Sequence, residues 1–196
     1  MMPSPLVYTW PYALVFWGVF VWAFAPEARV VSAKADRASA SQDANSKRLI
    51  MIGQGVAMLA AFTIAARVPS GVLPHRVWCF WIGVGALAGG SLLRRHCFRM
   101  LGSSFTGAVI VRPDQGVVER GAYRYVRHPS YSAGMVLFAG IGIALGNWIS
   151  LAVLVAAVGS VYAYRVRIEE RALATIIGEP YLRYMGRTKR FVPFLF

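Results

Sequence analysis

The sequence predicts an all-α integral membrane protein with about five transmembrane helices, and three observations lead to that fold class. First, 57% of the 196 residues are hydrophobic, which is too apolar for a soluble domain of this length. Second, the chain contains five apolar stretches near the roughly 17 to 25 residues that cross a bilayer. Third, the 21 Lys and Arg residues fall into blocks between these stretches. That distribution indicates membrane orientation and argues against nucleic acid as a partner.

The five predicted spans cover residues 6–25, 50–66, 77–93, 131–146 and 148–164. No Lys or Arg precedes the first span, and its apolar run is longer than a signal core, so we do not expect a cleaved signal peptide. The last two spans are joined at Gly146-Asn147-Trp148, which predicts a tight turn and a helical hairpin. Both are short and contain several glycines, so a hairpin that enters the bilayer without fully crossing it is the alternative.

The distribution of basic residues predicts the orientation of the spans. If the N-terminus lies outside, 19 of the 21 Lys and Arg residues fall on the cytoplasmic side, and only Arg67 and Arg76 fall on the external side. Short cytoplasmic loops are enriched in basic residues. We therefore expect an inner or plasma membrane protein whose residues 94–130 and C-terminal tail are cytoplasmic.

Residues 1–93 are predicted to form an N-terminal region of three transmembrane helices, and residues 94–196 to form the catalytic region. The segments 94–131 and 165–196 are the only polar ones long enough to build a cytoplasmic pocket. The glycines of the third span, Gly83, Gly85, Gly89 and Gly90, are expected to allow close helix packing.

Two charged motifs flank the hairpin and should meet at one membrane surface. Arg127-His128-Pro129-Ser130-Tyr131 precedes it, and a segment from Arg165 to Glu169-Glu170 follows it. Pro129 can occupy the first turn of the fourth helix, because a missing N–H costs little there. Two adjacent carboxylates in a chain with only eight acidic residues suggest a ligand that carries a positive charge.

The run from Gly121 to Tyr131, the Glu169-Glu170 pair and the segment Gly178–Tyr184 resemble the isoprenylcysteine carboxyl methyltransferase (ICMT) family and the related phospholipid methyltransferases, in a form typical of bacterial or archaeal members. The resemblance covers about residues 95–196 and implies a cytoplasmic S-adenosylmethionine pocket, with a lipid or prenylated substrate reaching it from the bilayer. By that resemblance, the cofactor-binding residues are His128, Tyr131, Glu169, Glu170 and Tyr181. Arg127 and Arg165 would face a substrate carboxylate.

The resemblance implies carboxyl O-methylation of an isoprenylcysteine or a similar lipid carboxylate. N-methylation of a phospholipid and methylation of a small thiol are alternatives, and a non-catalytic membrane binding protein or a transporter is the alternative from another class. Transport is disfavoured because the predicted spans contain no charged side chain. No metal is expected, because Cys79 and Cys97 have no metal-ligand spacing.

Overall fold

A computed structural model describes residues 4–32, 46–102 and 116–192 and confirms the all-α class. Its long helices are α1 (Tyr12–Ser32), α3 (Ser46–Arg67), α4 (Arg76–Leu101), α5 (Pro129–Ala144) and α6 (Trp148–Ile176), followed by the short helix α7 (Glu179–Arg187). Short 3-10 helices lie at Leu6–Tyr8 (η1), Pro69–Gly71 (η2) and Gly121–Arg124 (η4). The β-pairing within the described residues consists of two isolated bridges.

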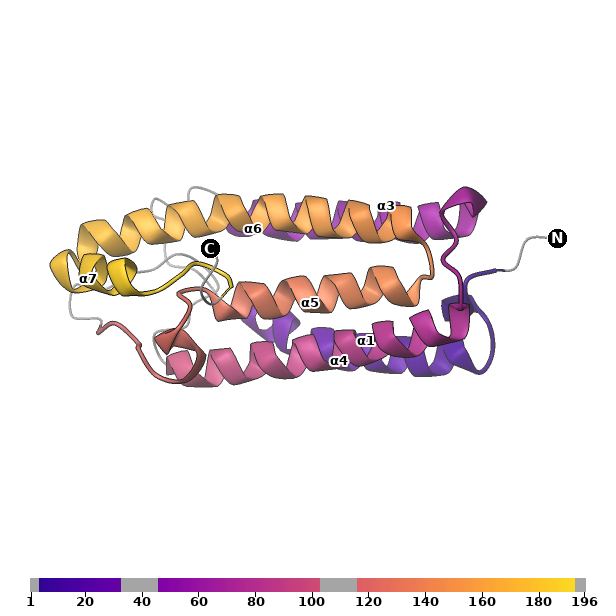
Figure 1. Ribbon diagram of the computed structural model, residues 1–196, viewed down its shortest axis with the longest axis horizontal. Helices are drawn as coiled ribbons and strands as arrows, with labels where there is room; N and C mark the ends of the chain where they lie inside the picture. Colours follow the sequence, from indigo (N-terminus) through magenta and orange to yellow (C-terminus); the bar gives the residue numbers. More distant parts are fainter. Residues whose placement is uncertain (1–3, 33–45, 103–115, 193–196) are drawn as a thin grey trace.

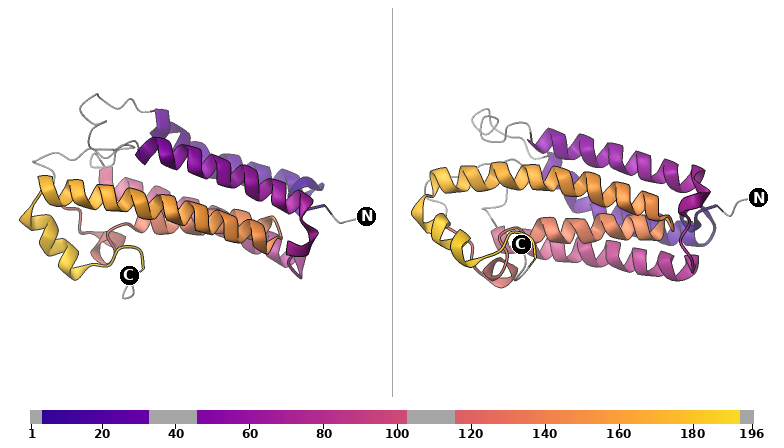
Figure 2. Two further views of the ribbon diagram at one scale, coloured as in Figure 1. Left: turned by 90° about the horizontal axis from the view of Figure 1, so that it is seen from above. Right: turned by 45° about the horizontal axis from the view of Figure 1, so that its top comes forward.

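The five long helices run along the long axis of an elongated bundle (Figures 1 and 2). Helix α5 packs most extensively on α4, and α6 packs most extensively on α3, while α5 and α6 form the predicted hairpin and α1 lies against α4. Helix α7 lies at one end of the bundle, and the N-terminus lies at the other (Figure 1). The α7 end is where α4 and α6 finish and α5 begins, so the two charged motifs share one end.

The five predicted spans coincide with the five long helices, but the boundaries differ. Helices α3 from Arg48, α4 and α6 are long and apolar enough to cross a membrane, whereas the apolar segments of α1 and α5 are shorter, at Tyr12–Ala25 and Pro129–Ala144. The number of helices that fully cross stays a prediction. The predicted fifth span ends at residue 164, whereas α6 continues to Ile176. Charged residues end burial in lipid, but Arg and Glu are good helix formers and do not end the helix.

Helices α4 and α5 approach each other closely at glycines. A Cβ on Gly90 would lie 2.6 Å from the backbone nitrogen of Leu137, and a Cβ on Gly83 would overlap the backbone of Ala144. The prediction of close packing at the glycines of this span is confirmed at these two positions. A Cβ on Gly85 or Gly89 would meet no other atom within 4 Å among the described residues, so these two glycines make no such approach.

The turn between α5 and α6 is fixed by Asn147, which is 1% exposed. Its Oδ1 accepts hydrogen bonds from the backbone N–H groups of Ile149 and Ser150 and so caps α6. Its Nδ2 donates to the carbonyl of Val68, just beyond α3, at 2.9 Å. The hairpin turn is thereby attached to the end of the neighbouring helix.

An aromatic core joins α1 to the rest of the bundle. Phe16 is fully buried and contacts Phe62 of α3, with ring centroids 6.1 Å apart. Phe24, also on α1, contacts Phe138 of α5. The helices of the predicted N-terminal region therefore pack against the hairpin as well as against one another. The predicted boundary between an N-terminal region (1–93) and a catalytic region (94–196) stays a prediction.

Candidate functional site

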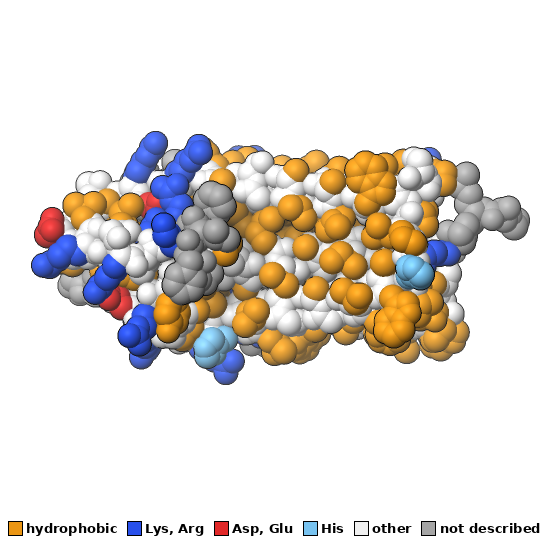
Figure 3. Space-filling view, in the orientation of Figure 1, with side chains coloured by type: hydrophobic (Ala, Val, Ile, Leu, Met, Phe, Trp, Pro, Cys, Tyr) orange, Lys and Arg blue, Asp and Glu red, His pale blue; other side chains and the backbone are white. Residues whose placement is uncertain are grey.

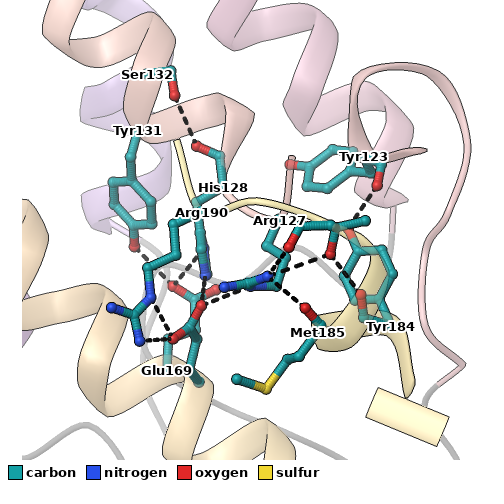
Figure 4. A network of polar contacts seen from close by, with 11 residues as sticks. Tyr123, Arg127, His128, Tyr131, Ser132, Glu169, Tyr184, Met185 and Arg190 are labelled. Carbon is teal, nitrogen blue, oxygen red and sulfur yellow. Dashed lines mark hydrogen bonds and ion pairs between the residues drawn. The ribbon is translucent and has the colours of Figure 1, made fainter. Parts of the chain in front are cut away.

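The two charged motifs meet in a polar cluster at the α7 end of the bundle. On the face drawn in Figure 3, basic and acidic side chains gather at this end, and hydrophobic side chains cover the middle of the molecule. Residues from the start of α5, the late turns of α6, α7 and the tail after α7 (188–192) supply the cluster (Figure 4). The predicted meeting of the motifs at one end of the hairpin is confirmed.

Pro129 is the first residue of α5, as predicted, and it places the first motif at the helix end. His128 precedes it outside the helix and is 4% exposed. The motif therefore enters the cluster from a helix N-terminus, where partial positive charge from the backbone N–H groups favours acidic partners.

Glu170 is the centre of the cluster and is 4% exposed. One carboxylate oxygen, Oε1, accepts a hydrogen bond from Nε of Arg127 at 2.9 Å. The other, Oε2, lies 2.9 and 2.8 Å from Nε and Nη2 of Arg190. His128 Nε2 lies 3.4 Å from Oε1. Two guanidinium groups at these distances compensate the charge of the buried carboxylate.

Glu169, next to Glu170 on α6, belongs to a second group of contacts in the cluster. The hydroxyl of Tyr131 donates a hydrogen bond to Oε2 of Glu169 at 3.0 Å. Nε of Arg165 donates to the same hydroxyl at 3.3 Å, and Arg165 is 4% exposed. One tyrosine of α5 therefore links the arginine and the glutamate that are four residues apart on α6.

Arg127 holds the tail against the start of α5. Its Nη1 donates to the carbonyl of Met185 at 3.0 Å and also to the carbonyl of Thr188. The backbone N–H groups of Arg127 and His128 donate to the carbonyls of Lys189 and Arg190 at 2.7 and 3.0 Å. The tail thus runs beside the first motif and brings the Arg190 side chain to Glu170.

Two further contacts close the tail side of the cluster. Ser132 Oγ donates to the carbonyl of Phe191 at 2.6 Å. The hydroxyl of Tyr184 donates to the carbonyl of Tyr123 at 2.6 Å, which ties α7 to η4. Burial raises the pKa of Tyr184 to about 12, because the ionised phenolate is disfavoured away from water.

Three buried polar atoms lack a hydrogen-bond partner within the described part of the chain. They are His128 Nε2, whose 3.4 Å approach to Glu170 lacks hydrogen-bond geometry, and the hydroxyls of Tyr123 and Tyr181. Burial raises the pKa of both tyrosines, and the negative charge of Glu170 adds to the effect at Tyr181. Buried polar atoms normally find partners, so the two that lie beside the acidic pair, on His128 and Tyr181, indicate where a polar ligand would bind.

The structure brings the seven residues predicted for the site together: Arg127, His128, Tyr131, Arg165, Glu169, Glu170 and Tyr181. The ion pair of Arg190 is not among the predictions, because the path of the tail has no local pattern. Neither is Arg94, which donates from Nη1 to the carbonyl of Ser130 at 3.0 Å. Part of the expected pocket segment, 103–115, lies outside the described residues.

Within the described ranges, no group of three or more His, Cys, Asp or Glu side chains could hold a metal ion. The acidic pair is instead contacted by arginine, histidine and tyrosine side chains.

Comparison with known proteins relates the segment that contains both charged motifs to one family. Residues 81–175 match the isoprenylcysteine carboxyl methyltransferase (ICMT) family. Protein-S-isoprenylcysteine O-methyltransferase B of Arabidopsis thaliana is 31% identical over 125 residues, which are 63% of this chain and 64% of that protein. The Schizosaccharomyces pombe protein-S-isoprenylcysteine O-methyltransferase is 29% identical over 57% of this chain and 48% of its own length. The chain thus spans less than two thirds of the length of either relative.

A solved structure of the eukaryotic intramembrane Ras methyltransferase ICMT shares the fold, with a TM-score of 0.61 and 21% sequence identity, and the match covers 97% of this chain and 70% of the solved chain. The relatives named here are eukaryotic, so the expected bacterial or archaeal type stays a prediction. The matched family segment contains both charged motifs, from Arg127 to Glu170. The resemblance of this chain to the isoprenylcysteine carboxyl methyltransferase family is thereby confirmed, in sequence over the two motifs and in fold over nearly the whole chain.

Proposed function

We propose that this chain is an S-adenosylmethionine-dependent membrane methyltransferase that methylates the carboxylate of an isoprenylcysteine or a similar lipid acid. One observation carries the proposal: the first motif and the Glu169-Glu170 pair form a single polar cluster at the end of the hairpin, within the segment that matches the family. The relatives' names, protein-S-isoprenylcysteine O-methyltransferase, support this choice of acceptor.

The residues of the cluster fit S-adenosylmethionine, which carries an ammonium group, a carboxylate, a ribose and an adenine. Glu169 and Glu170 offer carboxylates for the ammonium or the ribose hydroxyls. His128 Nε2 and the Tyr181 hydroxyl are buried polar atoms that a polar ligand would satisfy. We therefore assign these four residues to the cofactor, together with Tyr131, which borders both halves of the site. When bound, the cofactor would supply an activated methyl group.

Arg190 gives the acidic pair a means of exchanging partners. Its side chain is 46% exposed, whereas that of Arg127, the other arginine on Glu170, is 9% exposed. A half-exposed guanidinium can move into water at little cost, and a ligand ammonium could then take its place on Oε2 of Glu170. Arg127 would stay and keep the carboxylate ionised and oriented.

Arg165 is our candidate for holding the acceptor carboxylate. It is buried on the side of the cluster nearest the apolar part of α6, beside the Tyr131 hydroxyl. A lipid acid would present its carboxylate at this boundary, and a guanidinium group suits bidentate pairing with it. The resemblance implies Arg127 for the same task. Its contacts with Glu170 and with the carbonyls of Met185 and Thr188 favour a positioning role instead, as the residue that holds α7 and the tail over the acidic pair.

A carboxylate acceptor is already ionised at neutral pH, so the chain need not supply a general base. Its residues would accelerate the reaction by orienting the acceptor and by excluding water. Arg165 and Tyr131 would fix the position of the carboxylate. The tail, held by Arg127 and Ser132, would cover the polar side of the site.

The orientation of the site is part of the proposal. We place the cluster in the cytoplasm, because the basic ends of α4 and α6 lie at the same end of the bundle as α7 (Figure 1) and cytoplasmic segments are rich in Lys and Arg. The acceptor would then reach the cluster laterally from the bilayer.

The test uses the full chain purified in detergent. Calorimetry measures the binding of S-adenosylmethionine, and labelled cofactor is then offered with a farnesylcysteine analogue, with phosphatidylethanolamine and a small thiol as parallel acceptors. Methyl transfer to the farnesylcysteine analogue alone supports the proposal. Transfer only to phosphatidylethanolamine or to the thiol would show that the proposed acceptor is wrong. Failure to bind the cofactor would overturn the whole proposal.

A further inference from the structure

A polar contact inside the bundle involves a residue outside the segment that matches the family. Gln54 of α3 donates from Nε2 to the hydroxyl of Tyr162 on α6 at 2.9 Å. Nη1 of Arg94, on α4, lies 3.5 Å from the same hydroxyl. Three helices therefore meet at one hydroxyl, and the side chain that comes from α3 is a polar residue within an apolar run.

Two glycines make this meeting possible. A Cβ on Gly53 would lie 2.8 Å from Cγ2 of Val161, so α3 approaches α6 closely at the residue next to Gln54. A Cβ on Gly134 of α5 would lie 2.6 Å from the Tyr162 hydroxyl and 2.8 Å from Nη1 of Arg94. The space that the Tyr162 hydroxyl and its partners occupy therefore depends on the missing side chain of Gly134.

The contact leads directly to the acceptor side of the site. The rings of Tyr162 and Tyr131 have centroids 4.9 Å apart. The hydroxyl of Tyr131 accepts from Arg165, and Arg94 donates to the carbonyl of Ser130, the residue before Tyr131. Tyr162 is 2% exposed and lies about one turn before Arg165 on α6. The orientation of Tyr162 thus limits the position of Tyr131 and, through it, of Arg165.

We propose that Gln54 is a positioning residue of the acceptor site: through Tyr162 it fixes Tyr131 and Arg165 where the lipid carboxylate would bind. The inference rests on the proposed function and adds helix α3 to the site. Cofactor affinity should depend less on Gln54 than acceptor turnover does, because Tyr131 borders both halves of the site, whereas Glu170 is held by Arg127 and Arg190 and faces His128.

The simpler explanation is that Gln54 only strengthens the packing of α3 on α6. Hydrogen bonds between membrane helices do so modestly, and the chain offers a matched example. Ser150 Oγ of α6 donates to the carbonyl of Ala61 of α3 at 2.8 Å, between the same two helices but near the Asn147 turn. A packing role would make the two contacts equivalent in their effects.

The experiment compares Gln54→Met with Ser150→Ala in the full-length protein, using kinetics with the farnesylcysteine analogue, calorimetry of S-adenosylmethionine and thermal unfolding. Gln54→Met keeps side-chain length and removes the donor. We expect its kcat/KM for the acceptor to fall about fivefold, the effect of one interhelical hydrogen bond, while cofactor affinity changes by less than the acceptor kinetics do. Ser150→Ala should lower the unfolding temperature and leave the kinetics unchanged.

Equal kinetics of Gln54→Met and the unaltered protein would overturn the inference, as would equal kinetic losses in both variants. If Gln54→Met does not fold, Tyr162→Phe removes the hydroxyl that Gln54 and Arg94 share and keeps the ring beside Tyr131, and unchanged kinetics in that variant would overturn the inference. Absence of methyl transfer by the unaltered protein would overturn the proposed function, and the inference with it. Transfer by that protein together with normal kinetics in the variants would overturn the inference alone.

Discussion

Nε of Arg127 lies 2.9 Å from Oε1 of Glu170, and this buried ion pair joins two motifs that are 43 positions apart in the sequence. Because Arg127 also donates to the carbonyls of Met185, in α7, and Thr188, in the tail, the pair couples three segments: the start of α5, the late turns of α6, and α7 with the tail that follows it. A substitution at either residue should therefore weaken the contacts among all three segments.

Replacing Arg127 should loosen the tail. We expect Arg127→Ala to destabilise the protein by about 2 to 3 kcal/mol, because it leaves a buried carboxylate with one fewer cation and removes the side-chain donor of two carbonyls, those of Met185 and Thr188. Thermal unfolding in detergent and limited proteolysis of the tail measure the effect. Arg187→Ala is the control, since the pair of Arg187 with Glu119 is largely exposed and such pairs contribute about 1 kcal/mol or less. Equal stability of the two variants would contradict the prediction.

Removing the charge of Glu170 should weaken the binding of S-adenosylmethionine. We expect the Kd of Glu170→Gln to rise about tenfold or more, the size of one lost charge-assisted hydrogen bond. Calorimetry measures the change. Glu119→Gln serves as the control, because Glu119 is an exposed carboxylate that pairs with Arg187. An unchanged Kd would remove Glu170 from the residues assigned to the cofactor.

Arg165 should act on the acceptor and spare the cofactor. Arg165→Ala is expected to reduce turnover of a carboxylate acceptor by about a hundredfold, as the loss of a bidentate charged contact would, with cofactor affinity unchanged. The control is Arg167→Ala, because Arg167 is exposed on the same helix. Steady-state kinetics and calorimetry are the two measurements. Normal turnover in Arg165→Ala would exclude it as the acceptor residue.

Adjacent glycines of α4 should respond in opposite directions to the same change. Gly90→Ala places a Cβ 2.6 Å from the backbone of α5 and should destabilise the bundle by about 1 to 3 kcal/mol. A Cβ on Gly89 meets no atom of the described residues within 4 Å, so Gly89→Ala should stabilise the helix by about 0.5 to 1 kcal/mol. Unfolding temperatures of the two variants test this, and an unfolding temperature of Gly90→Ala equal to that of the unaltered protein would contradict the prediction.

Alkaline pH should weaken the attachment of α7 to η4. Tyrosine in an unfolded chain ionises near pH 10, whereas burial raises the pKa of Tyr184 to about 12. The neutral form is therefore favoured in the folded protein, and the stabilisation is complete below about pH 10 and lost as the pH rises towards 12.

Unfolding temperature as a function of pH measures this loss. Tyr184→Phe removes both the titrating group and its hydrogen bond to the carbonyl of Tyr123, so it should be less stable by about 1 kcal/mol at neutral pH and should lose less stability between about pH 10 and 12. Tyr125→Phe alters a 53% exposed tyrosine and should keep the original profile. Identical profiles for all three proteins would rule out a contribution from Tyr184.

Apolar runs were sufficient to predict the helices, because a span must bury its side chains in lipid over its whole length. The ends of the helices were less predictable. The charged residues from Arg165 to Arg171 follow the end of an apolar run, yet α6 continues to Ile176. The backbone hydrogen bonds of a helix form outside the lipid as well as within it, so the end of an apolar run does not fix the end of the helix. The glycines show the same limit, as Gly90 faces α5 and Gly89 does not.

The candidate site was predictable where its residues lie in local motifs, as His128 and Glu170 do. The contact of Arg190 with Glu170 depends on how the tail returns along the start of α5, and no periodicity or spacing encodes such a path. The sequence marks Gln54 as a polar residue inside an apolar run. Its partner, Tyr162, could be identified only from the packing of α3 on α6.

Helix α6 has its cap at one end of the bundle and the acidic pair at the other. Glu170 lies 23 residues after Asn147, which is about 35 Å of helix at roughly 1.5 Å per residue and slightly more than the hydrocarbon thickness of a typical bilayer. A thicker bilayer would place the acidic pair closer to the hydrocarbon, and a thinner one would place it farther out in the water. The acyl-chain length of the surrounding lipid thus becomes a variable that sets how far a substrate's headgroup must rise to meet Arg165.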